Sequence, residues 1–353
     1  MLATKNTNSI SYASIFKVVI VILGLAFLYV IRDVVGLLFV AVVVAAALDP
    51  FVDYLHKKKI PRAVSILAIY LILFGIVSLM IVSLVPAVSE QAGQLASNLP
   101  DYYERIALGF NRLGDGQQNV PATLPQALSG LSSNLAGATS GVFSTITGIF
   151  GGLVSLVSFL VIVFYLMVQE NGVKYFLQFL VPLKKRAEIM HLIDKIQTKL
   201  GFWLRGQLIL CLLVGLMVYL LLLIMGVKYA LLLGLIAAIT EIIPYVGPII
   251  GAVPGIFIAF SDSFTKVLMV ALVYLIVQQV ENSLLVPKIM QKSVGLNPVV
   301  VMVAILVGGS LGGVVGALLA VPVAAIIDVV VEDNFPRYKD ILEDTTGENK
   351  NEE

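Results

Sequence analysis

The chain has 353 residues, of which 59% are hydrophobic and 13% are charged, and its mean hydropathy is +0.99. Soluble domains carry about a quarter charged residues, so the composition excludes an ordinary soluble protein and indicates an integral membrane protein. The 23 Lys and Arg residues nearly balance the 22 Asp and Glu residues, so no excess of basic charge points to nucleic acid as a partner. With Cys211 as its single cysteine, the chain cannot form an intrachain disulfide.

Long apolar stretches recur along the chain. A helix needs about 20 mostly apolar residues to cross a bilayer, and these stretches show no strand-like alternation, which favours helices. We therefore predict an all-α, polytopic integral membrane protein with about eight membrane segments. They are expected at residues 10–31, 33–48, 63–86, 142–169, 206–227, 229–260, 264–286 and 298–330.

The composition divides the chain into four parts. Residues 1–86 hold the first three membrane helices and a basic cytoplasmic loop. Residues 87–141 form an extracytoplasmic helical insertion that we expect to break at Pro100, Pro121 and Pro125. Residues 142–331 form the transport core, and residues 332–353 form an acidic, flexible tail. If the spans alternate from a cytoplasmic N-terminus, most basic residues lie inside, which predicts a multi-pass cell-membrane protein with both termini cytoplasmic.

Within the core, the segment 170–205 has apolar residues on one helical face and lysines on the others. This pattern is typical of a helix on the cytoplasmic membrane surface, and equally of an amphipathic helix packed on the protein's own cytoplasmic ends. We expect Trp203 in the interfacial aromatic belt. Arg205, at the start of a span, is expected to reach the headgroups, with a role in holding broken helices as the alternative.

Two stretches, 229–260 and 298–330, are too long for one upright span and contain helix breakers. Irregular backbone persists in a membrane only where it is buried in protein or lines a wet cavity. We interpret both as broken helices or re-entrant hairpins that meet near the membrane midplane, as in many secondary transporters. Two kinked spans packed through their glycines remain the alternative. Besides the Pro244–Pro248 segment, the expected breaks are Gly251, Pro254, Gly308, Gly309, Gly312, Gly313, Gly316 and Pro322.

Only two acidic residues, Glu241 and Glu281, lie deep within apolar sequence. An ionised carboxylate in hydrocarbon is costly, so each must be protonated, paired or facing water. We expect them to bind and release protons on a solute or ion path. A structural role, with Glu241 bonded to amides freed by the break and Glu281 at the interface, is the alternative. The expected path consists of Glu241, Pro244, Gly247, Pro248, Gln278, Gln279, Glu281 and Asn282.

Sequence motifs for other chemistry are absent. The chain has no phosphate-binding loop, no His/Cys metal cluster and no convincing Ser-His-Asp set. We therefore expect no enzymatic activity, no cofactor and no bound metal. Transport driven by an ion gradient or by the solute's own gradient is what remains.

An ordered set of motifs resembles the autoinducer-2 exporter-like family of membrane proteins. The resemblance implies a multispanning transporter, a homo-oligomer, and structural motifs that contain Arg205, Gln207, Pro287 and Pro298. The matching motifs are Leu204–Gln207, Glu241–Pro248, Gln278–Asn282, Leu284–Pro287, Val294–Pro298 and the glycine-rich segment from Gly308 to Pro322.

The resemblance leaves the cargo open. Family members are associated with export of a small, polar, sugar-like quorum-sensing signal, and others with monovalent cation/proton antiport. A secondary exporter or facilitator of a small polar solute is the leading hypothesis, and a sodium or lithium/proton antiporter is the alternative. A membrane scaffold that binds a partner through residues 87–141 is a third hypothesis.

Overall fold

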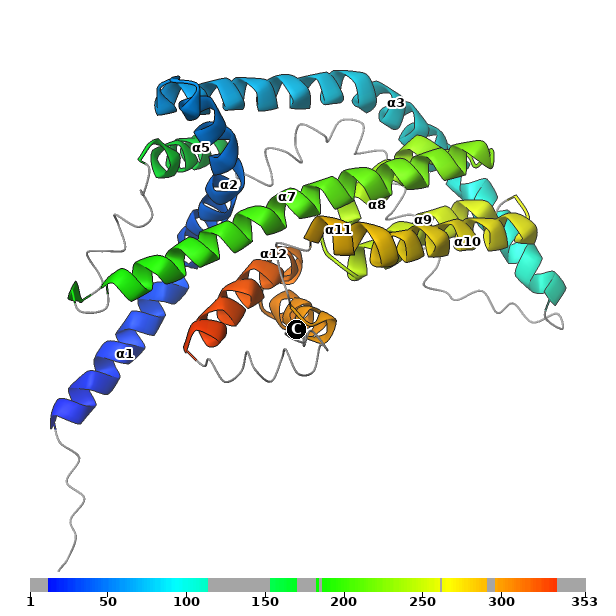
Figure 1. Cartoon of the computed structure of the whole chain (residues 1–353). Helices are drawn as coiled ribbons and strands as arrows, with labels where there is room; N and C mark the ends of the chain where they lie inside the picture. Colours follow the sequence, from blue (N-terminus) through cyan, green and yellow to red (C-terminus); the bar gives the residue numbers. More distant parts are fainter. Residues whose placement is uncertain are drawn as a thin grey trace, which may run out of the picture.

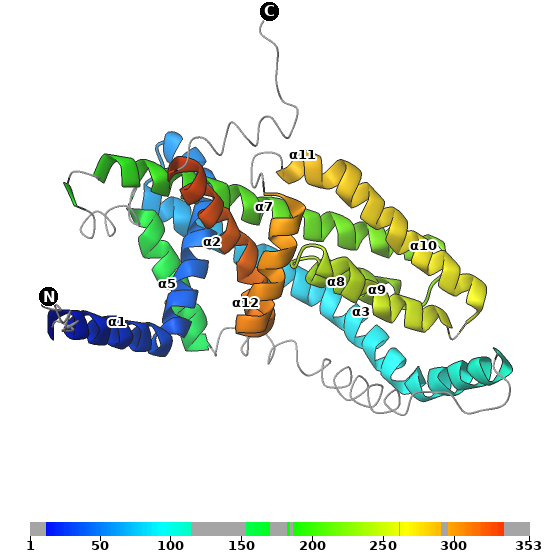
Figure 2. The same cartoon turned by 90° about the horizontal axis from the view of Figure 1, so that it is seen from below.

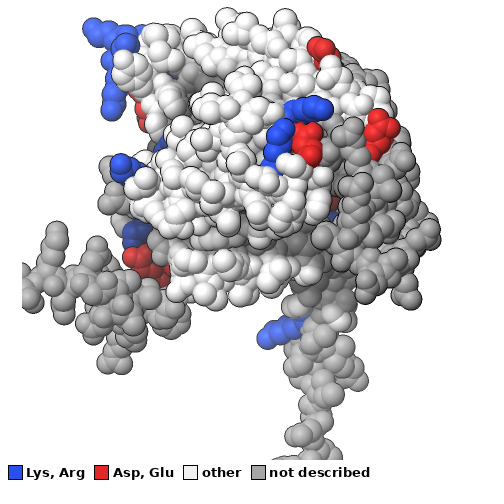
Figure 3. Space-filling model, turned by 90° about the vertical axis from the view of Figure 1, so that its right-hand side faces the viewer, with Lys and Arg blue, Asp and Glu red and all other residues white. Residues whose placement is uncertain are grey.

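The computed structural model describes residues 12–113, 153–169, 182–183, 186–260, 262–290 and 296–334. Every regular element within these residues is a helix, so the fold is all-α, as predicted. Five helices are long and apolar enough to cross a membrane, and three shorter apolar helices accompany them. Much of the face in Figure 3 carries no charge, as expected for a surface in contact with lipid. Most of the predicted insertion, part of the segment 170–205 and the acidic tail beyond residue 334 lie outside the described residues.

The N-terminal helices form one apolar cluster. α1 (Tyr12–Val30) continues almost directly into α2 (Arg32–Lys57), which packs against the first part of α3 (Arg62–Leu113) and against α5 (Leu153–Val168). The Arg62 side chain ties these three helices together. It donates a 2.8 Å hydrogen bond to the backbone carbonyl of Met167 and pairs with Asp49 and Asp53 on α2.

α3 differs from the prediction at its C-terminal end. The break expected at Pro100 is wrong, because α3 runs unbroken across the expected boundary at residue 86 and through Pro100 to Leu113. Ala92 and Leu95 on this extension are buried against α7, α8 and α9. Tertiary packing therefore holds the part of α3 that lies before Pro100 on the rest of the protein.

α7 (Arg186–Ile224) is the central helix, with α2 and α5 near one end and α8, α9 and α10 near the other (Figures 1 and 2). It joins the predicted amphipathic segment and the following span into one helix of 39 residues. Its N-terminal half packs on the protein itself: Lys195 and Lys199 pair with Asp333 and Asp328 of α12, at 2.6 and 2.7 Å. Residues 186–205 of this segment therefore pack on the protein itself, and the cytoplasmic location of the segment stays a prediction.

The first broken stretch is a helical hairpin. α8 (Ala230–Thr240) and α9 (Val246–Phe260) pack against each other across a turn at residues 241–245. The turn is tight, since a Cβ added to Gly247 would lie 2.8 Å from the Cα of Glu241. Gly251 and Pro254, expected as breaks, lie instead inside α9.

The second stretch is also a hairpin. α12 (Pro298–Asn334) contains non-helical backbone at Gly312 and Gly313, and Gly313 has φ of 60° and ψ of −143°, a region open mainly to glycine. Its two arms meet at Gly308 and Gly316, because a Cβ on Gly308 would clash with the Gly316 backbone. Gly308, Gly309, Gly316 and Pro322 were also expected as breaks, but they lie inside the helical arms. The buried Pro322 is tolerated there because neighbouring helices enclose it.

The remaining helix changes its hydrogen-bond register. α10 (Phe264–Val280) continues through a π-helix, η2 (Glu281–Leu285), into α11 (Val286–Met290). Pro287 lacks an amide hydrogen and cannot bond the carbonyl four residues before it. The preceding amide, of Val286, reaches back five residues to the carbonyl of Glu281. Such π-helical turns are frequent at functional sites.

Candidate functional site

The two acidic residues singled out in the sequence meet inside the protein. Glu241 caps the C-terminus of α8 at the hairpin turn, and Glu281 opens η2. Their relative exposures are 1% and 5%, and the two carboxyl groups contact each other directly. The folding of 229–260 into a hairpin brings the turn against η2, which is how residues 40 positions apart come together.

One carboxyl oxygen of each acid has no hydrogen-bond partner in the described part of the chain. Oε2 of Glu241 and Oε2 of Glu281 are buried and receive no hydrogen bond from the described residues. Two ionised carboxylates in contact within a low-dielectric site repel each other strongly. The pair therefore requires a shared proton, a bound cation or a polar solute.

Gln207 on α7 completes the polar centre. It is 1% exposed, and its side-chain Nε2 donates a 2.6 Å hydrogen bond to the backbone carbonyl of Glu241. Gln207 thereby fixes the end of α8 relative to the central helix. The resemblance had assigned it only to a structural motif.

A cavity of about 180 Å³, called the inner cavity below, surrounds these groups. Its walls come from α7, the α8–α9 turn, η2, α11 and both arms of α12. Ligand pockets for drug-sized molecules are usually about 300–1,000 Å³, so the inner cavity suits an ion or a small solute. Lining it are Trp203, Gln207, Leu210, Glu241, Pro244, Tyr245, Glu281, Asn282, Val286, Met290, Leu296, Pro298, Val301 and Val321.

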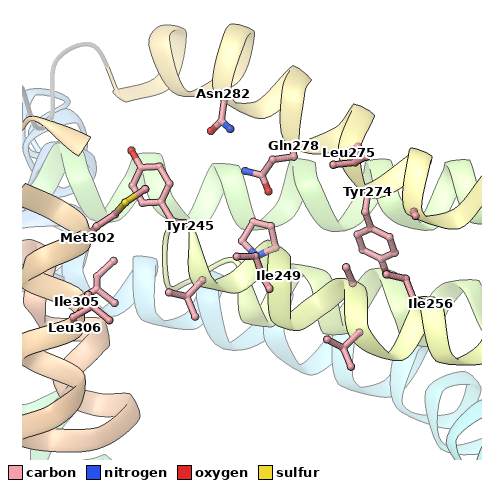
Figure 4. Close-up of a pocket in the computed structure, with 15 residues that line it drawn as sticks. Tyr245, Ile249, Ile256, Tyr274, Leu275, Gln278, Asn282, Met302, Ile305 and Leu306 are labelled. Atoms are coloured by element: carbon pink, nitrogen blue, oxygen red, sulfur yellow. The ribbon is translucent and has the colours of Figure 1, made fainter. Parts of the chain in front are cut away.

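A larger apolar cavity of about 800 Å³, called the outer groove, adjoins the inner one. It lies between α9, α10 and the first arm of α12, with Gln278 and Asn282 pointing into it from above in Figure 4. Tyr245 and Asn282 line both cavities. Tyr245 has φ of 63°, which is uncommon for a non-glycine residue and typical of constrained functional segments.

Most of the expected path residues lie at these cavities. Pro244 lines the inner cavity, Pro248 and Gln278 line the outer groove, and Gly247 is buried beside the turn. Gln279 does not: its side chain is exposed and donates to the Ser283 hydroxyl at 2.9 Å. Adjacent side chains on a helix point about 100° apart. For this reason Gln278 lines the outer groove while Gln279 points away from it.

The broken backbone of the two hairpins was expected to meet, but the two turns do not contact each other in the way expected. The turn of the first hairpin packs against the arms of α12, through contacts of Ile243 and Tyr245 with the cluster of Val301 and Val321. The glycine turn of α12 is not part of either cavity, and Gly312 and Gly313 have no neighbouring atoms within 4 Å of an added Cβ. The acid pair is therefore formed at the break between α8 and α9, which holds Glu241, and at the π-helix η2, which holds Glu281.

Arg205 does not take the role expected of an interfacial arginine. Its Nη1 donates to the backbone carbonyls of Ala46 and Ala47 on α2, at 3.3 and 2.9 Å. Pro50 has no amide hydrogen to offer the carbonyl of Ala46, four residues before it. Arg205 thus satisfies a carbonyl that the proline leaves free and joins α2 to α7.

Sequence reasoning missed three aromatic residues. Trp203, expected at the membrane interface, is 3% exposed and lines the inner cavity. Tyr245 and Tyr274 line the outer groove. Tyr245 stood inside the Pro-Gly segment and could have been found there, whereas Tyr274 and Trp203 look like ordinary apolar helix residues.

The arrangement offers oxygen ligands and a proton site but no transition-metal centre. No group of three or more His, Cys, Asp or Glu side chains that could hold a metal occurs within the described part of the chain. The chemistry of two carboxyls, an amide and helix-end carbonyls suits protons, hard cations and polar solutes.

Comparisons with known proteins agree with this architecture. The family model described as "AI-2E family transporter" matches residues 18–335 of this chain. "Putative transport protein YrrI" of Bacillus subtilis is 32% identical over 86% of this chain and 88% of its own length. "Putative transport protein YueF" of the same organism is 32% identical over 77% of each chain. The AI-2 transport protein TqsA of Escherichia coli is 25% identical over 89% of each chain. The chain, with its polytopic helical fold, therefore belongs to the AI-2E family of membrane transporters.

Proposed function

We propose that the protein is a secondary exporter or facilitator of a small polar solute, with the Glu241–Glu281 pair as its proton-coupled site. The contact of two buried carboxyls at a helix break carries this proposal. A polar solute that enters the inner cavity exchanges its hydration shell for carboxyl, amide and backbone groups. TqsA is named as a transporter of AI-2, which makes sugar-like signals of this kind the first solutes to test.

Sodium or lithium/proton antiport is the second candidate. A carboxyl pair can hold either protons or a hard cation, and exchange of one for the other is antiport. The contact between the two carboxyls favours this candidate as much as it favours proton coupling. The scaffold hypothesis has less support, because residues 87–98 of the insertion pack against the chain's own hairpin.

We further propose that both termini face the cytoplasm and that the chain forms a homo-oligomer in the cell membrane. The distribution of Lys and Arg supports the orientation. The family resemblance supports oligomer formation.

Flux assays in proteoliposomes that enclose a pH-sensitive dye test these proposals. Candidate polar solutes, sodium or lithium are added outside, and the internal pH and solute uptake are followed. We expect solute-linked proton movement that both Glu241→Gln and Glu281→Gln abolish. The control is Glu90→Gln, because Glu90 is exposed on α3 and lies outside both cavities.

The outcomes separate the candidates. Proton movement driven by sodium or lithium but by no polar solute favours antiport. Wild-type flux in both glutamine variants across a wide pH range would exclude the acid pair as the coupling site.

A further inference from the structure

The outer groove is too large and too apolar for the solute assigned to the inner cavity. Its volume is about 800 Å³, and Ile249, Val253, Leu275 and Leu306 on its walls are 62–72% exposed. Leu275 and Leu306 lie on helices long and apolar enough to cross a membrane, and Ile249 and Val253 lie on the shorter apolar helix α9. An exposed apolar wall on such helices is suited to contact with lipid. A molecule can therefore reach it from within the bilayer.

Polar groups follow one face of α10 from the groove to the acids. Tyr274, Gln278 and Glu281 are spaced four and three residues apart, so they share a helix face. The Tyr274 hydroxyl is buried and has no hydrogen-bond partner among the described residues. The walls of the groove are therefore mainly apolar, with one line of polar side chains that leads to the two carboxyl groups.

Charge complementarity specifies the ligand's sign. Among the described residues that line the two cavities there is no Lys, Arg or His, and the carboxyl groups are those of Glu241 and Glu281. Aromatic rings lie along the same route, at Tyr274, Tyr245 and Trp203. Buried carboxyls together with aromatic faces attract cations and disfavour anions.

We propose that the outer groove and the inner cavity together bind a lipophilic organic cation, which enters from the bilayer and displaces a proton from the Glu241–Glu281 pair. The apolar part of the ligand occupies the groove, and its positive charge lies near Tyr245 and the acids. The inference rests on the proposed function only in using the same acid pair, since it adds a second class of ligand and an entry route.

Two ions of the same shape and opposite charge give a direct test. Binding of radiolabelled tetraphenylphosphonium and of tetraphenylborate to the purified full-length protein is measured by equilibrium dialysis. We expect saturable binding of the phosphonium, which weakens as the pH is lowered because protons compete for the acids. Glu241→Gln and Glu281→Gln should each weaken it by about tenfold or more, and tetraphenylborate should not bind saturably.

A groove variant tests the apolar half separately. Val253→Trp narrows the groove at an exposed wall, away from the acids, and should weaken phosphonium binding by about tenfold. Val314→Trp is the matched control, because Val314 is 74% exposed on α12 and lines neither cavity. Gel filtration and helical circular dichroism verify that each variant is folded.

The results distinguish this inference from the proposed function. Absence of saturable phosphonium binding, equal binding of both ions, or unchanged binding in the glutamine variants would overturn the inference and leave the groove to lipid or to a second copy of the chain. If solute-linked proton flux still requires the acids, the proposed function stands alone. If phosphonium binds as expected and no polar solute is transported, with or without protons, the proposed function fails and the inference stands.

Discussion

The side-chain amide of Gln207 donates a 2.6 Å hydrogen bond to the backbone carbonyl of Glu241. The bond joins the central helix α7 to the last turn of α8, where the helix break leaves carbonyls without partners. The position of the Glu241 carboxyl therefore depends on a residue 34 positions earlier in the chain.

Replacing this amide should impair both stability and transport. Gln207→Leu keeps the size of the side chain and leaves the Glu241 carbonyl buried without a donor, which typically costs about 1–3 kcal/mol. We expect a lower thermal midpoint in detergent and reduced flux in proteoliposomes. Gln279→Leu is the control, because the Gln279 amide is exposed and bonds the nearby Ser283 hydroxyl on its own helix. Equal losses in the two variants would contradict the role of Gln207.

Arg205 and Pro50 should show thermodynamic coupling. Arg205→Ala removes donors to Ala46 and Ala47 and should destabilise the protein by about 1.5–3 kcal/mol. Pro50→Ala supplies an amide for the Ala46 carbonyl, so it should recover part of the loss when combined with Arg205→Ala. Thermal unfolding of the single and double variants measures the coupling. Strict additivity would refute the capping of Ala46 by Arg205.

Alanine substitutions at the neighbouring Gly312 and Gly313, in the turn of α12, should have very different effects on stability. Gly313 has φ of 60° and ψ of −143°, whereas Gly312 has φ of −135°, which any residue can adopt. Both positions are open to an added Cβ. Gly313→Ala should therefore destabilise the protein by about 1–3 kcal/mol, while Gly312→Ala should have little effect on the thermal midpoint. A larger effect at Gly312 would refute this hairpin geometry.

The two ion pairs between α7 and α12 should contribute unequally to the stability of the fold. In the Lys199–Asp328 pair, the side chains are 20% and 27% exposed, against 45% and 21% for Lys195–Asp333. The less exposed pair is less screened by solvent, so its coupling energy should be larger, although exposed pairs contribute only about 0.2–1 kcal/mol. Double-mutant cycles on both pairs test the order, and the exchange Lys199→Asp with Asp328→Lys should restore stability.

The extension of α3 should hold the first turn of α8. The Gln91 side chain accepts a 3.0 Å hydrogen bond from the Leu232 amide, and Asn98 donates to the Tyr229 hydroxyl at 3.0 Å. The Leu232 amide lies in the first helical turn, where amides lack intrahelical acceptors. Gln91→Ala should accelerate hydrogen exchange in the peptide that contains residues 230–233. Gln94→Ala is the control, because the exposed Gln94 amide bonds Glu90 on its own helix.

The sequence by itself determined the class of the protein and the location of two of its helix breaks. Apolar stretches of membrane length can only be helices in lipid, because their backbone groups have no water to bond. Glu241 and Glu281 stood out for the same reason, since carboxyls in apolar sequence are costly without a partner. Gly312 and Gly313, and the segment that begins at Pro244, were identified from residue chemistry alone.

The tertiary structure decided which of these residues act together. Pro100 and Pro322 both lie inside helices, and at Pro322 the enclosing helices compensate for the missing backbone bond. Trp203 and Arg205 face the protein interior because α7 crosses α2 and α12, which no local pattern reports. The contact between Glu241 and Glu281 depends on the fold of the α8–α9 hairpin, because side chains distant in sequence meet only when the intervening chain reverses direction.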